Sequence, residues 1–253
     1  MDLSSRVKLN NGVEMPWVGL GVFRSAPGRE TEQAARWALE IGYRHIDTAA
    51  YYDNETDVGR ALKASGLPRE SVFITTKVWN ADQGYESTLK AFDRSRAKLG
   101  MDVVDLYLIH WPVKGKFPDT WRALEKLYAD GKVRAIGVSN FLVHHLEDLK
   151  KTSSVVPAVN QVEFHPFLIQ KDLLEYDSKR GIRHEAWAPL GHARGFDNPV
   201  IASLARKYGK TPAQILLRWD LQLGVVTIPK SVHRERIEEN SRFFDFELEQ
   251  ADV

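Results

Sequence analysis

The amino-acid sequence predicts an α/β protein folded as a closed (β/α)8 barrel, the TIM-barrel architecture. Three observations indicate this fold: eight short runs rich in β-branched and aromatic residues, helical apolar spacing between them, and a length of 253 residues. Strands that alternate with helices pair in parallel through right-handed crossovers. Eight such units in about 250 residues favour a closed barrel over an open doubly wound sheet.

The strand candidates are followed by turns with polar residues and then by helical stretches. The candidates cover residues 17–23, 43–47, 72–78, 104–110, 133–139, 159–163, 182–188 and 225–228. The helical stretches repeat apolar residues at spacings of three and four, as in Ala34, Trp37, Ala38 and Ile41. This spacing gives each helix one apolar face with which to cover the barrel.

A hairpin is predicted ahead of the first strand. Residues 7–9 and 13–15 flank Asn10-Asn11-Gly12, a turn that tolerates positive φ. The hairpin is expected to close the bottom of the barrel. No Pro-rich or Ser-rich linker and no low-complexity segment interrupts the chain, so residues 1–253 are expected to form a single domain.

The composition excludes several classes of protein. Lys and Arg number 35 and Asp and Glu number 34, with a formal net charge of +1, so neither a nucleic acid nor a membrane is an expected partner. The chain has no cysteine, which excludes disulfides, thiolate metal sites and cysteine nucleophiles. Its first residues lack the basic and apolar regions of a secretory signal, and we expect a cytoplasmic protein.

Side chains suited to proton transfer occur at the ends of three strand candidates. Asp47 ends the second candidate, Lys77 lies near the end of the third, and His110 ends the fourth. Tyr52 follows Asp47 by five residues. The C-terminal ends of barrel strands converge on the face that carries the active site, and a buried lysine needs a carboxylate such as Asp47. Because a nearby ammonium lowers the pKa of a phenol, these residues predict a site that protonates a carbonyl oxygen.

Two further groups of residues suggest a nucleotide. The first offers hydroxyl and amide groups suited to a carboxamide, and a flat ring face: Ser139, Asn140, Gln161 and Trp187. The second surrounds an expected helix start and is suited to a phosphate: Lys230, Ser231 and Arg236. A carboxamide-bearing ring together with a phosphate indicates a nicotinamide dinucleotide, and the basic phosphate pocket favours the 2′-phosphate of NADP.

The chain resembles the aldo/keto reductase family over essentially its whole length. The motifs that carry the resemblance are Asp47 to Glu55, Lys77, Leu106 to Pro112, Gly137 to Phe141, Asn160 to Pro166 and Ile228 to Ser231. Within the family it is most similar to protozoan-type prostaglandin F synthases and bacterial 2,5-diketo-D-gluconate reductases. The resemblance implies a monomeric NADPH-dependent enzyme that reduces aldehydes, ketones or dicarbonyls, with a prostaglandin endoperoxide as an alternative substrate.

The same resemblance implies a role for each group of residues. Tyr52 is expected to be the general acid, Lys77 and Asp47 the pair that activates it, and His110 the residue that orients the carbonyl. The residues expected to bind NADP(H) are Gly21, Val22, Asp47, Ser139, Asn140, Gln161, Trp187, Ala188, Pro189, Leu190, Lys230, Ser231, Val232, Arg236, Glu239 and Asn240. The residues expected to contact substrate are Phe23, Trp79, His110 and Trp111. No metal is expected.

Two features depart from the family pattern. Family members usually continue past residue 253 in a tail that helps close the substrate pocket, so the chain is expected to lack this tail or to have a short one. His184 stands where the family usually has an apolar residue or threonine. Two alternatives stay open: a non-catalytic NADP-binding barrel, and a metal-dependent barrel hydrolase, which the absence of a His-x-His motif disfavours.

Overall fold

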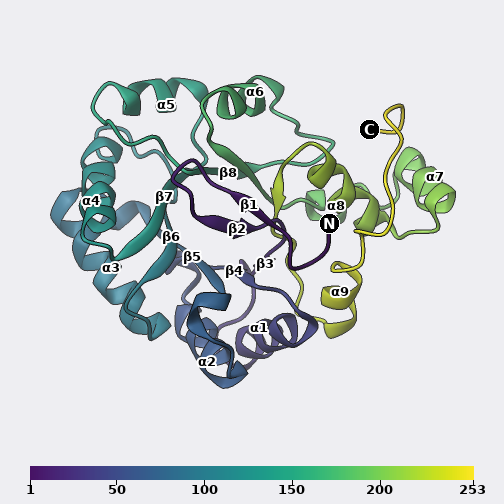
Figure 1. Cartoon of the computed structure of the whole chain (residues 1–253), viewed down its shortest axis with the longest axis horizontal. Helices are drawn as coiled ribbons and strands as arrows, with labels where there is room; N and C mark the ends of the chain where they lie inside the picture. The colour runs from purple at the N-terminus through teal and green to yellow at the C-terminus, as the bar shows by residue number, and fades with distance from the viewer.

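Eight parallel strands follow one another around a single sheet in chain order (Figure 1). The computed structural model describes residues 1–253. The strands are β3 (Leu20–Gly21), β4 (His45–Asp47), β5 (Phe73–Val78), β6 (Val104–Ile109), β7 (Val133–Ser139), β8 (Val159–Glu163), β9 (Arg183–Trp187) and β10 (Val226–Thr227). The predicted (β/α)8 fold is confirmed.

The first and last strands meet and close the barrel. Gly21 of β3 pairs in parallel with Lys230, just beyond β10, and the Gly21 amide donates to the Pro229 carbonyl oxygen at 3.1 Å. Glycine is needed at this seam, because a Cβ on Gly21 would lie 2.8 Å from the Ile228 carbonyl oxygen. The last strand can therefore approach the first closely only where the first carries no side chain.

The structure shortens the first and last predicted strands. β3 and β10 contain two residues each, although the apolar runs cover residues 17–23 and 225–228. Across the seam these runs face each other through isolated bridges and not through a continuous ladder. The other six strands agree with the predicted ranges to within two residues at each end.

Nine α-helices surround the sheet, as Figure 1 shows. They are α1 (Arg29–Ile41), α2 (Glu55–Ser65), α3 (Tyr85–Leu99), α4 (Phe117–Ala129), α5 (Val143–Lys150), α6 (Lys171–Lys179), α7 (Pro199–Tyr208), α8 (Pro212–Gln222) and α9 (Arg234–Glu239). Thr211 and Gln214 form a capping box that starts α8, with Pro212 in its first turn. No helix is both long enough and apolar enough to cross a membrane.

The predicted hairpin covers the end of the barrel at which the strands begin. β1 (Arg6–Lys8) and β2 (Glu14–Pro16) pair antiparallel, with Val7 opposite Met15. Val7 and Met15 are buried in the same apolar cluster as Phe73 and Val159, the first residues of β5 and β8. Figure 1 shows the hairpin lying across the barrel. The end at which the strands finish is left open to ligands.

Candidate active site

A cavity of ≈ 390 Å³ opens at the end of the barrel where the strands finish. Asp47, Tyr52 and His110 line it, and Lys77 is fully buried next to them. The other lining residues are Gly21, Phe23, Arg24, Tyr51, Trp79, Trp111, Ser139, Asn140, Gln161, Trp187, Ala188, His192, Ile228 and Lys230. The structure therefore brings together the four residues that the sequence indicates for proton transfer.

Lys77 of β5 is held by Asp47 of the neighbouring strand β4. Lys77 Nζ donates to Asp47 Oδ1 at 2.7 Å and to the Thr48 carbonyl oxygen at 2.9 Å. Burial by itself lowers the pKa of Lys77, but the negative charge of Asp47 and of neighbouring acidic groups outweighs it, and the pKa is raised. An ammonium ion is therefore present inside the barrel at neutral pH.

Tyr52 is the last residue of a short 3-10 helix, Ala50–Tyr52, that follows β4. Lys77 Nζ lies 5.1 Å from the centre of the Tyr52 ring. Burial raises the pKa of Tyr52, and the Lys77 ammonium offsets this increase only in part. The expectation of a lowered pKa is therefore wrong in its net direction, because desolvation of the phenolate is the larger effect. The phenol is protonated at neutral pH and has a proton to give.

His110 faces Tyr52 across the cavity. Their ring centres are 5.6 Å apart, with the planes at 76°. Burial, and to a smaller extent the charge of Lys77, lower the pKa of His110 to about 3, so the imidazole is neutral at neutral pH. Its Nδ1 is buried without a hydrogen-bond partner, which leaves Nε2 as the nitrogen for a ligand. A neutral imidazole can donate a hydrogen bond to a carbonyl oxygen without carrying the proton that is transferred.

Hydrogen bonds fix the amide and indole groups around the cavity. Asn140 Nδ2 donates to the His110 carbonyl oxygen at 2.9 Å, and Trp187 Nε1 donates to Asn140 Oδ1 at 2.9 Å. Gln161 Nε2 donates to Asp47 Oδ2 at 2.8 Å. Asn140 has a left-handed backbone, with φ of 62°, and these bonds hold it there. The groups that were predicted for a nicotinamide are thus connected to the residues that were predicted for proton transfer.

Some of the predicted cofactor residues lie outside the cavity, most of them around α9. These residues are Val22, Pro189, Leu190, Ser231, Val232, Arg236, Glu239 and Asn240. Arg236 is exposed on α9, whereas Arg234 on the same helix pairs with Glu40 at 3.1 Å. Glu239 Oε1 accepts a hydrogen bond from Thr211 Oγ1 at 2.8 Å. The structure thus places one group of the predicted cofactor residues at the cavity and another around α9, with Val22, Pro189 and Leu190 in neither group.

The cavity also includes residues outside the set predicted from the sequence. They are Arg24, Tyr51, His192 and Ile228. Tyr51 stacks on Trp79 with ring centres 3.8 Å apart, and its place beside Tyr52 was the signal that could have identified it. Arg24 and His192 have left-handed backbones, with φ of 58° and 55°. This conformation is set by their loops, and no sequence pattern indicated it.

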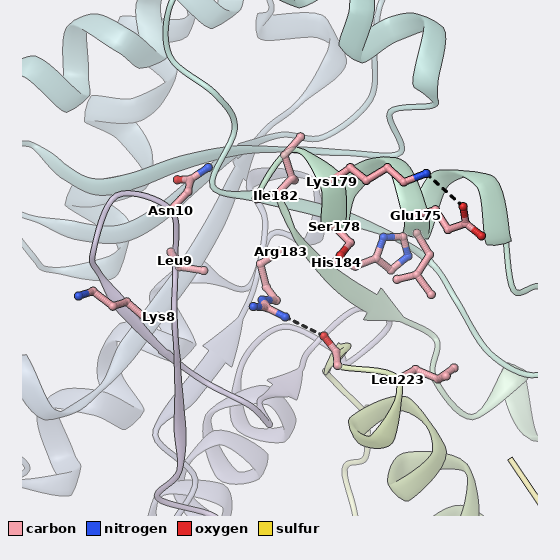
Figure 2. A pocket seen from close by; sticks show the side chains of 13 residues that line it. Lys8, Leu9, Asn10, Glu175, Ser178, Lys179, Ile182, Arg183, His184 and Leu223 are labelled. Atoms are coloured by element: carbon pink, nitrogen blue, oxygen red, sulfur yellow. Dashed lines mark hydrogen bonds and ion pairs between the residues drawn. The ribbon is translucent and has the colours of Figure 1, made fainter. Parts of the chain in front are cut away.

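A separate hollow of ≈ 740 Å³ lies at the hairpin end of the barrel (Figure 2). Its residues come mainly from the hairpin, α6 and the start of β9, several of which are labelled in Figure 2. Arg183 donates to the Gly224 carbonyl oxygen at 2.9 Å. His184 is buried at this hollow, with Nδ1 2.8 Å from Asp177 Oδ2. This contact ties β9 to α6 and accounts for a histidine where an apolar residue was expected. None of the four proton-transfer residues lines this hollow.

Known proteins of similar sequence and structure share one family. Residues 18–253 match the aldo/keto reductase family. A glyoxal reductase of Bacillus subtilis (strain 168) is 59% identical over 251 residues, which cover 99% of this chain and 91% of that protein. A 9,11-endoperoxide prostaglandin H2 reductase of Trypanosoma cruzi (strain CL Brener) is 55% identical over 250 residues, which cover 98% of this chain and 88% of that protein. The crystal structure of a Bombyx mori aldo-keto reductase in complex with NADP matches with a TM-score of 0.93 at 36% identity, over 98% of this chain and 90% of that one. The chain therefore belongs to the aldo/keto reductase family.

Proposed function

We propose that the protein is an NADPH-dependent carbonyl reductase in which Tyr52 protonates the carbonyl oxygen as a hydride reaches the carbonyl carbon. The observation that carries this proposal is the buried Lys77–Asp47 ion pair beside a protonated phenol at the open end of the barrel. A fixed positive charge next to Tyr52 stabilises the phenolate that forms when its proton leaves. Membership of the aldo/keto reductase family supports an oxidoreductase that uses NADP(H).

The four residues have separate tasks in the proposed reaction. Tyr52 gives its phenolic proton to the carbonyl oxygen, and Lys77 stabilises the resulting phenolate. Asp47 keeps Lys77 charged and holds it in place through the 2.7 Å contact. His110 is neutral and donates from Nε2 to the carbonyl oxygen, which directs that oxygen towards Tyr52. Proton transfer and orientation are thus assigned to different side chains.

The residues at the cavity fit a nicotinamide dinucleotide phosphate. When bound, NADPH supplies the hydride. The side-chain nitrogen of Gln161 donates to Asp47, which leaves the side-chain oxygen Oε1 of Gln161 to accept a hydrogen bond from a carboxamide. Trp187 lines the cavity and offers an aromatic ring for stacking. Lys230 lines the same cavity, and Arg236 is exposed beyond it on α9, so both can contact phosphate groups.

The substrate class is proposed from the walls of the cavity. Aromatic rings dominate them, with Phe23, Tyr51, Trp79 and Trp111 around the four proton-transfer residues. Flat, compact carbonyl compounds fit such a surface, and we propose aromatic aldehydes and small dicarbonyls as substrates. The relatives named for glyoxal and for an endoperoxide of prostaglandin H2 support the same range. A cytoplasmic location and a monomeric state stay predictions from the sequence.

NADPH consumption by the purified chain tests this function. The assay uses an aromatic aldehyde and glyoxal as separate substrates, with NADPH binding measured in parallel by fluorescence. We expect saturable turnover of both compounds, because neither requires a contact outside the cavity. Binding of NADPH without turnover of either compound would instead favour a non-catalytic NADP-binding barrel. A chain that does not bind NADPH would contradict the proposal.

Arg236→Ala is expected to weaken NADPH binding by about 10- to 100-fold and NADH binding by less than about threefold. The reason is that a charge-assisted contact to a phosphate contributes roughly 1.5–3 kcal/mol, and only NADPH carries the 2′-phosphate. Dissociation constants for both cofactors, measured by fluorescence titration, check this result. Arg234→Ala is the matched control, because Arg234 is on the same helix but pairs with Glu40. Equal weakening of NADPH and NADH would remove Arg236 from the 2′-phosphate site.

A further inference from the structure

Glu185, in the middle of β9, is a fully buried acid connected to the Lys77–Asp47 pair. Gln161 Nε2 donates to Glu185 Oε2 at 2.8 Å and to Asp47 Oδ2 at 2.8 Å, so one amide group joins the two carboxyl groups. An ionised Asp47 can only accept hydrogen bonds, which turns the NH₂ group of Gln161 towards it. Both hydrogens of that group are therefore used by the two acids.

The positive charge of Lys77 favours the ionised form of Glu185, but burial and the negative charge of Asp47 outweigh it. From β4, His45 Nε2 lies 3.9 Å from Glu185 Oε1, but burial lowers the pKa of His45 to about 3, so it is neutral. From β5, the Lys77 ammonium is hydrogen-bonded to Asp47, and Tyr52 beyond β4 is a protonated phenol. The strand β10 on the other side has no titratable residue. Glu185 Oε1 is buried with no hydrogen-bond partner.

The surroundings favour a neutral acid. Burial, together with the negative charge of Asp47, raises the pKa of Glu185 to about 8. At neutral pH, most Glu185 side chains are therefore protonated, and Asp47 alone balances Lys77. Above this pH a second negative charge appears in the same buried cluster. That charge raises the pKa of Tyr52 further, because it opposes formation of the phenolate.

We propose that Glu185 is a positioning residue that holds the Gln161 amide against Asp47 and, through the Asp47–Lys77 pair, sets how readily Tyr52 exchanges its proton. This inference rests on the proposed function. The effect of Glu185 should be clearest in the reverse reaction, the oxidation of an alcohol. In that reaction the Tyr52 phenolate takes the proton of the alcohol hydroxyl, and the carbon that bears this hydroxyl gives a hydride to NADP⁺. Ionised Glu185 raises the pH at which that phenolate forms, and so it opposes oxidation at moderately alkaline pH.

Infrared spectroscopy of the protein without cofactor tests the protonation of Glu185 directly. We expect a carbonyl stretch from a protonated carboxylic acid at pH 6 that disappears with a midpoint near pH 8. Glu185→Gln should remove this signal. Asp220→Asn is the matched control, because burial also raises the pKa of Asp220, which accepts a hydrogen bond from Thr227. This control should lose the band of Asp220 and keep the band that Glu185→Gln removes. A spectrum that is unchanged by Glu185→Gln would overturn the proposal.

The pH profile of alcohol oxidation tests the effect on Tyr52. The glutamine of Glu185→Gln has an oxygen that accepts from Gln161, but its side chain cannot ionise. In this variant, kcat/KM for oxidation should begin to rise with pH about half a pH unit lower than in the wild type. Oxidation at a pH on this rise should therefore be roughly threefold faster. Asp220→Asn should leave the profile unchanged. Identical profiles for the wild type and Glu185→Gln would show that Glu185 has only a structural role.

Glu185→Met removes the acceptor as well as the charge. We expect kcat for reduction to fall by about tenfold in this variant and to stay within about twofold of the wild type in Glu185→Gln, because only the methionine releases Gln161. If the methionine variant does not fold, the infrared and pH experiments on Glu185→Gln still decide the question. If the wild-type protein reduces no carbonyl compound, the proposed function is overturned. The infrared experiment would still test whether Glu185 is protonated.

Discussion

Tyr52→Phe is expected to lower kcat for carbonyl reduction by about 10²- to 10⁴-fold, the range attributed to a positioned general acid. The substitution removes one oxygen atom and keeps the ring, which packs against Phe23 with ring centres 4.9 Å apart. NADPH affinity should stay within about twofold of the wild type, because the phenol is proposed to act on the substrate. Stopped-flow measurement of NADPH oxidation, together with a fluorescence titration of NADPH, separates the two effects.

The matched control for this change is Tyr51→Phe. Tyr51 is adjacent in sequence, lines the same cavity and stacks on Trp79, but it is about half exposed, whereas Lys77 lies over the Tyr52 ring. This control should keep most of its turnover, with any change confined to KM. If Tyr51→Phe were inactive and Tyr52→Phe active, the general acid would have to be reassigned.

Lys77→Met is expected to reduce both turnover and stability. Without the ammonium, the Tyr52 phenolate loses the charge that stabilises it, and kcat should fall by at least about 10²-fold. Asp47 would also be left as a buried carboxylate without a cation, which typically costs about 3–5 kcal/mol of unfolding free energy. Chemical denaturation at pH 7 and steady-state kinetics on the same preparation measure the two losses.

A double variant distinguishes the two roles of Lys77. Lys77→Met combined with Asp47→Asn removes the uncompensated charge, so it should recover much of the lost stability. It should not recover turnover, because Tyr52 still has no positive charge beside it. Recovery of both would mean that the kinetic loss in Lys77→Met came from misfolding, and it would contradict the proposed role of Lys77.

The sequence predicts where the residues proposed for proton transfer lie, because the C-terminal ends of all strands in a parallel barrel share one face. Asp47, Lys77 and His110 lie at or near the ends of apolar runs, and the parallel barrel brings these ends together. Asp47 and His110 line the cavity, and Lys77 is buried next to them. The direction of the pKa of Tyr52 was not predictable in this way. It depends on the balance between the Lys77 charge and the depth of burial, and only the folded structure sets that depth.

Other features were missed because they depend on contacts between different helices and strands. Glu185 lies in a strand that also contains Arg183 and His184, so its charge does not stand out in the sequence as that of Lys77 does. Its partner Gln161, and Asp47 beyond it, come from other strands. The contact of His184 with Asp177 likewise joins a strand to a helix that precedes it. In such cases the sequence shows that a residue is unusual, but only the folded structure shows which residue it contacts.

The seam between β3 and β10 also constrains the order in which the active site is assembled during synthesis. Gly21 and Lys230 belong to opposite ends of the chain, yet they are neighbours across the seam and line the same cavity. A chain emerging from the ribosome can form β4 and β5, which carry Asp47 and Lys77, and β6, which ends just before His110, long before residue 230 is available. Its cavity would have no wall on the β10 side until then, and contacts so distant in sequence form slowly. Competence to bind a nucleotide should therefore be among the last properties that a newly made chain acquires.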